Sequence, residues 1–165
     1  MAEREDIVDR IRRAWGEAIP SMDTSAIDVW GRLHRTSALA TAQIERVLAG
    51  SGVSRSEFDV LCALARTPRP LRASEVTAET MLSGAATTKL TARLEAAGLL
   101  QREKSDRDGR VVHLSLTDAG RSLVEREIPR CLAHDERLLD GFSAAERDAL
   151  AGLLARLMEN AQREV

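Results

Sequence analysis

Short polar side chains with a single positive charge gather near the middle of this chain. They are Ser83, Thr87, Thr88, Lys89 and Thr91. On one face of a helix, such side chains allow close approach to base edges and phosphates in a DNA major groove, because nothing bulky holds the helix off. A solvated helix face carries the same residue types, so this stretch alone leaves both interpretations open.

A charged segment that contains a glycine follows, with the sequence SDRDGR over residues 105–110. Arg107 and Arg110 can reach a phosphate or a narrow minor groove, and Asp108 is close enough to hold one guanidinium by a two-point contact. Apolar residues at near-alternate positions on both sides, over 99–104 and 111–116, predict a hairpin with a basic tip. An ordinary surface hairpin with mixed charges is the alternative.

Two short helices must position these groups. The first is expected over residues 73–80, and after a turn Ser83 caps the second through its hydroxyl. The second helix carries apolar residues at spacings of four and three, which mark its expected buried face: Leu90, Leu94 and Ala97. Gly98 can take the left-handed conformation that ends a helix. The predicted order is helix, turn, helix, wing.

Longer amphipathic helices are expected on both sides of this unit. On the N-terminal side they cover residues 3–19, 24–49 and 55–66, and the third opens with a capping box made by Ser54 and Glu57. On the C-terminal side they cover 117–139 and a last helix to about 163. We expect a mainly α fold with an N-terminal dimerisation scaffold (1–52), a winged helix-turn-helix DNA-binding unit (53–117) and C-terminal dimerisation helices (118–165).

The last helix carries a clear apolar stripe at helical spacing: Leu150, Leu153, Leu154, Leu157 and Met158. The first helix has Ile7, Ile11 and Trp15 along one side. These stripes either fold back on their own domain or pair with a second copy of the chain. We expect a homodimer, because a two-fold protein places two recognition helices about 34 Å apart on one face of a duplex and reads a near-palindrome.

Composition favours an ordinary globular protein, since 44% of the 165 residues are hydrophobic and 30% are charged. The net charge of -2 hides an uneven distribution. Between Arg66 and Arg110, nine basic residues face six acidic ones, which leaves 15 against 20 in the remainder. The basic excess therefore coincides with the helices and hairpin that would contact DNA.

Other classes of function find little support in the sequence. An enzyme is not expected, because there is no GxSxG, no glycine-rich phosphate loop and no HExxH. We expect neither a cofactor nor a metal, since Cys62 and Cys131 form no CxxC and the three histidines lie far apart. Single-stranded nucleic acid requires exposed aromatics, and none are expected here, because the chain has no tyrosine and its two Phe and two Trp lie in apolar stripes. The chain also lacks an apolar run of about 20 residues and an uncharged N-terminal signal, so we expect a cytoplasmic protein with no membrane partner.

The run from LSGAATTKLTARLEAAGLLQRE through DRDGRVVHLSLTDAG resembles the winged helix-turn-helix of MarR-type transcriptional regulators. Asp108, Arg110, Leu116 and Thr117 carry the wing signature and its exit. The resemblance implies a homodimer joined through its terminal helices, double-stranded DNA as the partner and, most often, repression of a nearby gene. It also implies a small aromatic or anionic ligand that releases the DNA.

The additional N-terminal helix resembles the urate-responsive branch of that family. Trp15, Asp59 and Arg102 match positions that handle ligand there, whereas Leu90 stands where that branch has an arginine. Leucine cannot pair with Asp59 or with an anion, which argues against urate itself. Trp15 as a packing residue and Asp59 as a solvated helix position are the alternatives.

Two alternative functions stay open. One is a winged-helix interaction protein that does not bind specific DNA. The other is a cysteine-based redox sensor, although the reactive cysteine of such relatives usually lies in the first long helix, where this chain has none. Cys62 lies among apolar residues and is expected to be a buried small hydrophobe.

Overall fold

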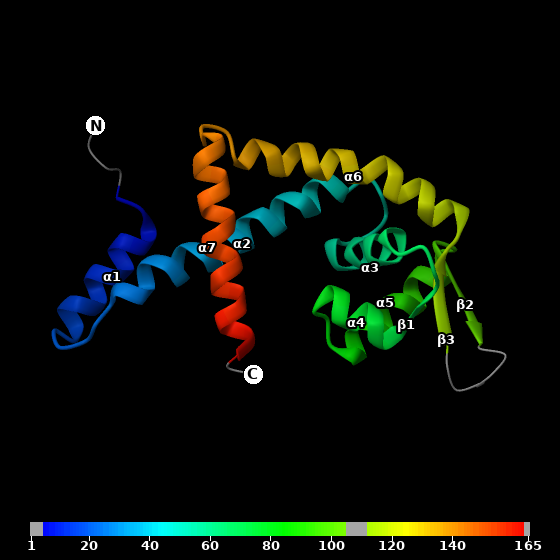
Figure 1. Cartoon of the computed structure of the whole chain (residues 1–165), viewed down its shortest axis with the longest axis horizontal. Helices are drawn as coiled ribbons and strands as arrows, with labels where there is room; N and C mark the ends of the chain where they lie inside the picture. Colours follow the sequence, from blue (N-terminus) through cyan, green and yellow to red (C-terminus); the bar gives the residue numbers. More distant parts are fainter. Residues whose placement is uncertain (1–4, 105–111, 164–165) are drawn as a thin grey trace.

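The computed structural model describes residues 5–104 and 112–163 and is mainly α-helical, as predicted (Figure 1). Its elements are α1 (Ile7–Ala18), α2 (Ser25–Leu48), α3 (Arg55–Arg66), β1 (Leu71–Arg72), α4 (Ala73–Thr80), α5 (Gly84–Ala96), β2 (Leu100–Lys104), β3 (Val112–Leu116), α6 (Asp118–Leu138) and α7 (Ala144–Arg163). No helix in the described ranges is long and apolar enough to span a membrane.

Side-chain caps set the helix starts where the sequence predicts them. The Ser54 amide donates to Glu57 Oε2 at 2.8 Å, and the Ser54 hydroxyl accepts from the Glu57 amide, which completes the capping box of α3. The Thr117 hydroxyl accepts from the Gly120 amide at 3.1 Å and so caps α6. These bonds satisfy amide groups that have no partner inside the helix.

The predicted hairpin is present, and a third strand that the sequence did not predict extends it. The strand order is β1-β3-β2 and all pairs are antiparallel, with Leu71 opposite Leu114 and Leu100 opposite Leu116. A strand of two residues is too short to show an alternating pattern, so only its tertiary pairing with β3 defines it. The pairing fixes the connection between α3 and α4 to the base of the wing.

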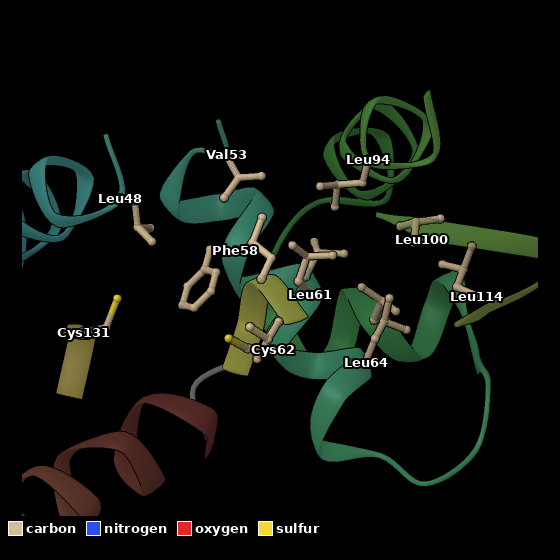
Figure 2. Packing of buried hydrophobic residues seen from close by; sticks show 14 of the residues in the cluster. Leu48, Val53, Phe58, Leu61, Cys62, Leu64, Leu94, Leu100, Leu114 and Cys131 are labelled. Carbon is tan, nitrogen blue, oxygen red and sulfur yellow. The ribbon is translucent and has the colours of Figure 1, made fainter. Parts of the chain in front are cut away.

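The buried core lies where α3 meets α5, α6 and the small sheet (Figure 2). Its central side chains are Leu48, Phe58, Leu61, Leu64, Leu94, Leu100 and Leu114, and both cysteines join it. The sequence predicts this for Cys62 and Leu94. The helix-turn-helix and the wing thus share one core with the end of α2 and with α6.

A close backbone contact joins α6 to the exit of α5. A Cβ placed on Gly120 would lie 1.9 Å from the Leu99 carbonyl oxygen. No side chain fits in that space, so glycine lets the first turn of α6 lie directly against the segment between α5 and β2. This contact positions the wing strands relative to the long helix.

The apolar stripe of α1 stays open within one chain. Of α1, only Val8 is buried, while the Trp15 side chain is 47% exposed. The reason is that α1 packs beside α2 at the end remote from α3, as Figure 1 shows, and two helices alone cannot enclose a stripe. Instead, the Arg32 guanidinium of α2 joins the helices through Asp6 at 2.9 Å and Asp9 at 2.8 Å.

Candidate nucleic-acid interface

The outward face of α5 is lined by small and polar residues. Ser83, Thr88 and Lys89 are exposed, and so are Ala85 and Ala92. The Ser83 hydroxyl accepts from the Ala86 amide at 3.2 Å and starts the helix as predicted. Because Lys89 is the one long side chain among these five, the α5 backbone can approach a surface closely, and the Lys89 ammonium group is available to a phosphate.

Two residues predicted for this face lie on the opposite one. Thr87 and Thr91 are buried, which corrects the expectation that they face DNA. The Thr87 hydroxyl is 2.9 Å from that of Thr77 on α4, and Thr91 donates to the Thr87 carbonyl at 2.8 Å. With its hydroxyl satisfied by a helix carbonyl, threonine packs as a branched apolar residue.

The buried stripe of α5 therefore runs through Thr87, Thr91 and Leu94. The sequence predicts Leu94, but it places Leu90 and Ala97 in the stripe instead of the two threonines. Leu90 is half-buried against the edge of the core, and Ala97 is exposed. The true stripe keeps the spacing of four and three but is shifted around the helix toward α4.

The end of α5 is set by a left-handed glycine. Gly98 has φ of 70°, and the Leu99 amide donates to the Leu94 carbonyl at 2.9 Å. This is the closure that the sequence predicts for Gly98. It turns the chain at once into β2, so that the wing begins beside the last turn of α5.

The strands of the wing are in place beside α5, and Lys104 pairs with Val112 at their outer end. The predicted contact residues Arg107, Asp108 and Arg110 belong to the connection between these strands and lie outside the described residues.

Arg102 ties the wing to α5. Its Nη2 donates to the Thr91 hydroxyl at 2.7 Å, and its Nε lies 3.0 Å from Glu95 Oε2. The Nε contact has the distance of an ion pair without the alignment of a hydrogen bond. A second ion pair, from Arg93 Nε to the buried Glu57 at 3.1 Å, ties α5 to α3. Sequence spacing gives no sign of either contact, because both join separate elements.

The three predicted ligand residues are not brought together within one chain. Trp15 lies on α1, remote from α3 in Figure 1, while Asp59 accepts from Arg55 Nε at 2.9 Å on its own helix. Arg102 is engaged by Thr91 and Glu95. Leu90, at the position where the urate-responsive branch has an arginine, packs against the core.

The cysteines occupy the core. Cys62 on α3 and Cys131 on α6 are both buried, and both are free thiols. Burial raises the pKa of Cys62 to about 11, and it raises the pKa of Cys131 as well. Each thiol is therefore protonated at neutral pH, whereas a redox-active cysteine needs the thiolate.

Known proteins are similar to this chain in sequence and in fold. Residues 51–111 match the model of the MarR family. The HTH-type transcriptional regulator PecS of Dickeya dadantii (strain 3937) is 30% identical over 159 residues, which cover 95% of each chain.

Two solved structures share the fold. Bordetella bronchiseptica BpsR, whose DNA binding is regulated by 6-hydroxynicotinic acid, is 29% identical with a TM-score of 0.72 over 79% of this chain and 98% of its own. The MepR–DNA complex of S. aureus is 19% identical with a TM-score of 0.75 over 80% of this chain and 98% of its own, which shows the fold alone.

Proposed function

Because the chain belongs to the MarR family of winged helix-turn-helix transcriptional regulators, we propose that it is a homodimeric repressor of a nearby gene. It binds a near-palindromic site in double-stranded DNA through residues 53–117, and a small aromatic or anionic ligand releases it. The outward face of α5 beside the wing is the observation that carries this proposal.

The DNA contacts divide by chemistry. Ser83, Thr88 and Lys89 enter the major groove, where the hydroxyls bind base edges and the ammonium binds a phosphate. Arg107 and Arg110 contact the backbone from the wing, with Asp108 orienting one guanidinium. Thr87 and Thr91 take no part in these contacts, because both side chains are buried on the opposite face of α5.

The terminal helices supply the support for a dimer. Among the described residues, α7 buries no side chain, and Leu153 and Met158 are 58% and 59% exposed. An apolar groove of about 720 Å³ runs between α2, α6 and α7, lined among others by Val29, Leu138 and Leu154. Apolar surface of this extent marks an interface. We propose that a second copy covers it.

The ligand proposal starts from BpsR, whose DNA binding responds to 6-hydroxynicotinic acid. An aromatic carboxylate of this kind needs an apolar surface for its ring and a cation for its charge. Trp15, Asp59 and Arg102 form that site only in the dimer, because one chain does not bring the three together. The ligand then changes the spacing of the two α5 helices and so weakens DNA binding.

Fluorescence anisotropy against labelled duplex tests DNA binding. The duplex comes from the region upstream of the gene, a scrambled duplex serves as reference, and both are titrated at two salt concentrations. We expect tight, salt-sensitive binding that prefers the upstream duplex. Equal, weak binding to both duplexes would contradict the proposal for that region and favour a winged-helix protein that acts on a protein partner.

Lys89→Gln tests the assignment of α5 in the same assay. Loss of one phosphate contact should reduce the slope of log affinity against log salt by about 1 for each subunit. Arg121→Gln on α6 is the matched control, since it removes one exposed positive charge from a helix other than α5. An equal change in slope for both variants would mean that only overall charge matters.

A further inference from the structure

Met81 stands in the turn between α4 and α5 with its side chain 93% exposed. Of the large apolar side chains in the described ranges, it is the one most exposed to solvent. The next residue, Leu82, is half-buried against the core, so the turn is anchored by Leu82 while Met81 projects outward. Ser83 then caps α5.

The backbone at Met81 has an unusual conformation. With φ of 55° and ψ of 20°, it is the left-handed cap of α4, and it is the single described residue other than glycine with positive φ. Glycine or asparagine normally fills this position, because a Cβ is strained there. Met81 therefore costs folding free energy at this turn.

Packing within the chain does not offset this cost. An apolar residue near such a cap usually contacts the preceding helical turn, but a side chain that is 93% exposed makes no such contact. Solvation favours glycine as well, since a large apolar side chain gains nothing from facing water. Both the backbone and the side chain thus favour a different residue unless Met81 contacts something outside the chain.

We propose that Met81 is a DNA contact that reads thymine, with its side chain packed on the C5 methyl of one thymine per half-site. The proposal rests on the proposed function, because it is the insertion of α5 into the major groove that brings the turn to the base edges. The thymine methyl is the apolar feature of that groove. Methionine, unbranched and polarizable, adapts to such a partner.

The size of the effect follows from the area of one methyl group. Removing a methyl that is buried against Met81 should weaken binding about fourfold for each thymine. This is smaller than the loss of a two-point polar contact to a base, so Met81 adds to a sequence preference that polar contacts to base edges mainly set.

Single thymine-to-deoxyuridine replacements in the upstream duplex test the proposal, because each removes one methyl and nothing else. We expect the wild type to lose about fourfold at one thymine per half-site, and Met81→Gly to lose nothing there. Met81→Leu should keep the discrimination. Met22→Ala, which removes an exposed methionine in the connection between α1 and α2, is the control and should behave as the wild type.

The possible failures are distinguishable. If the wild type shows no preference for the upstream duplex, the proposed function fails for that duplex and the thymine contact fails with it. If binding is specific but Met81→Gly weakens it equally on both versions of the duplex, Met81 touches sugar and phosphate, and the thymine assignment is overturned.

Thermal unfolding gives a second readout that does not depend on DNA. Glycine should relieve the left-handed strain and raise Tm by about 2–4 °C. A lower Tm for Met81→Gly would show that Met81 stabilises the fold, and the argument from an uncompensated cost would be wrong.

Discussion

The winged unit and the terminal helices carry similar amphipathic patterns, but the winged unit buries its apolar stripes within the chain and α1 and α7 leave theirs exposed. In the winged unit, the stripes of α3, α5 and the small sheet close on one another and bury Leu61, Leu94 and Leu114 almost completely. In α1 and α7 the stripes stay open, since α1 buries Val8 alone and α7 buries no side chain in the described ranges. A periodic apolar stripe therefore predicts that a face will be covered, but not which chain covers it.

The largest expected effect lies in the open region. Replacing Leu153 and Leu154 by aspartate together should weaken dimerisation by about 100-fold or more, because symmetry places each charge in the interface twice. DNA affinity should fall with it. Helix content should stay unchanged, since none of the α7 side chains is buried within its own chain in the described ranges. Sedimentation velocity and circular dichroism measure the two quantities.

Arg156→Glu is the control for this variant. It changes the net charge by the same amount on the same helix, but outside the apolar stripe. If Arg156→Glu separates the subunits as well, charge rather than burial of the stripe governs assembly. If the double variant loses its helical signal, α7 belongs to the core of its own chain.

An added methyl group should destabilise the tightly packed base of the wing and stabilise the exposed helix α7. Gly120→Ala forces a Cβ against the Leu99 carbonyl and should destabilise the fold by about 3 kcal/mol, measured by urea unfolding. Gly152→Ala in α7 meets nothing within 4 Å and should stabilise it by about 0.5–1 kcal/mol through helix propensity. Equal effects at both sites would remove the contrast between the regions.

A wing substitution should alter DNA binding without altering either region's packing. Arg110→Ala should weaken binding about tenfold on upstream and scrambled duplexes alike, and it should flatten the salt dependence. Thr88→Ala should instead change the preference between duplexes. If Arg110→Ala leaves both affinities intact, the wing does not contact DNA.

The smallest effect should come from the thiols. Since burial holds the pKa of Cys62 near 11, above the ordinary 9.0, the folded state prefers the protonated thiol. Its contribution to stability is present below pH 9 and is lost as pH rises toward 11. A chromogenic disulfide should therefore label the folded protein slowly at pH 8 and rapidly in urea. Fast labelling of the folded state would reopen the redox alternative.

Local signals predicted the winged unit well. The capping residues Ser54, Ser83 and Thr117 and the closing glycine Gly98 act through bonds to neighbours in sequence, so their spacing reveals them. The hairpin strands follow from alternation in the same way. What local patterns could not show is pairing between distant segments, and this is why β1 and the Arg102 contacts were not predicted.

The site was predicted less completely than the fold. Thr87 and Thr91 were placed on the wrong face because threonine counts as polar in a sequence pattern, whereas a hydroxyl bonded to a helix carbonyl can be buried. The sequence gives no sign of a role for Met81, because its left-handed backbone and its exposure are visible only in the structure. For Trp15 the sequence leaves ligand binding and packing open, and within one chain its side chain is 47% exposed.

The most direct test of the account is the stoichiometry of the protein on its upstream duplex, measured by sedimentation velocity with labelled DNA. The account predicts two chains per duplex, bound more tightly to the upstream than to the scrambled sequence, and loss of this species in the Leu153 and Leu154 double variant. A single chain bound with the same preference would contradict the claim that the open apolar helices join two copies to place two α5 helices on DNA.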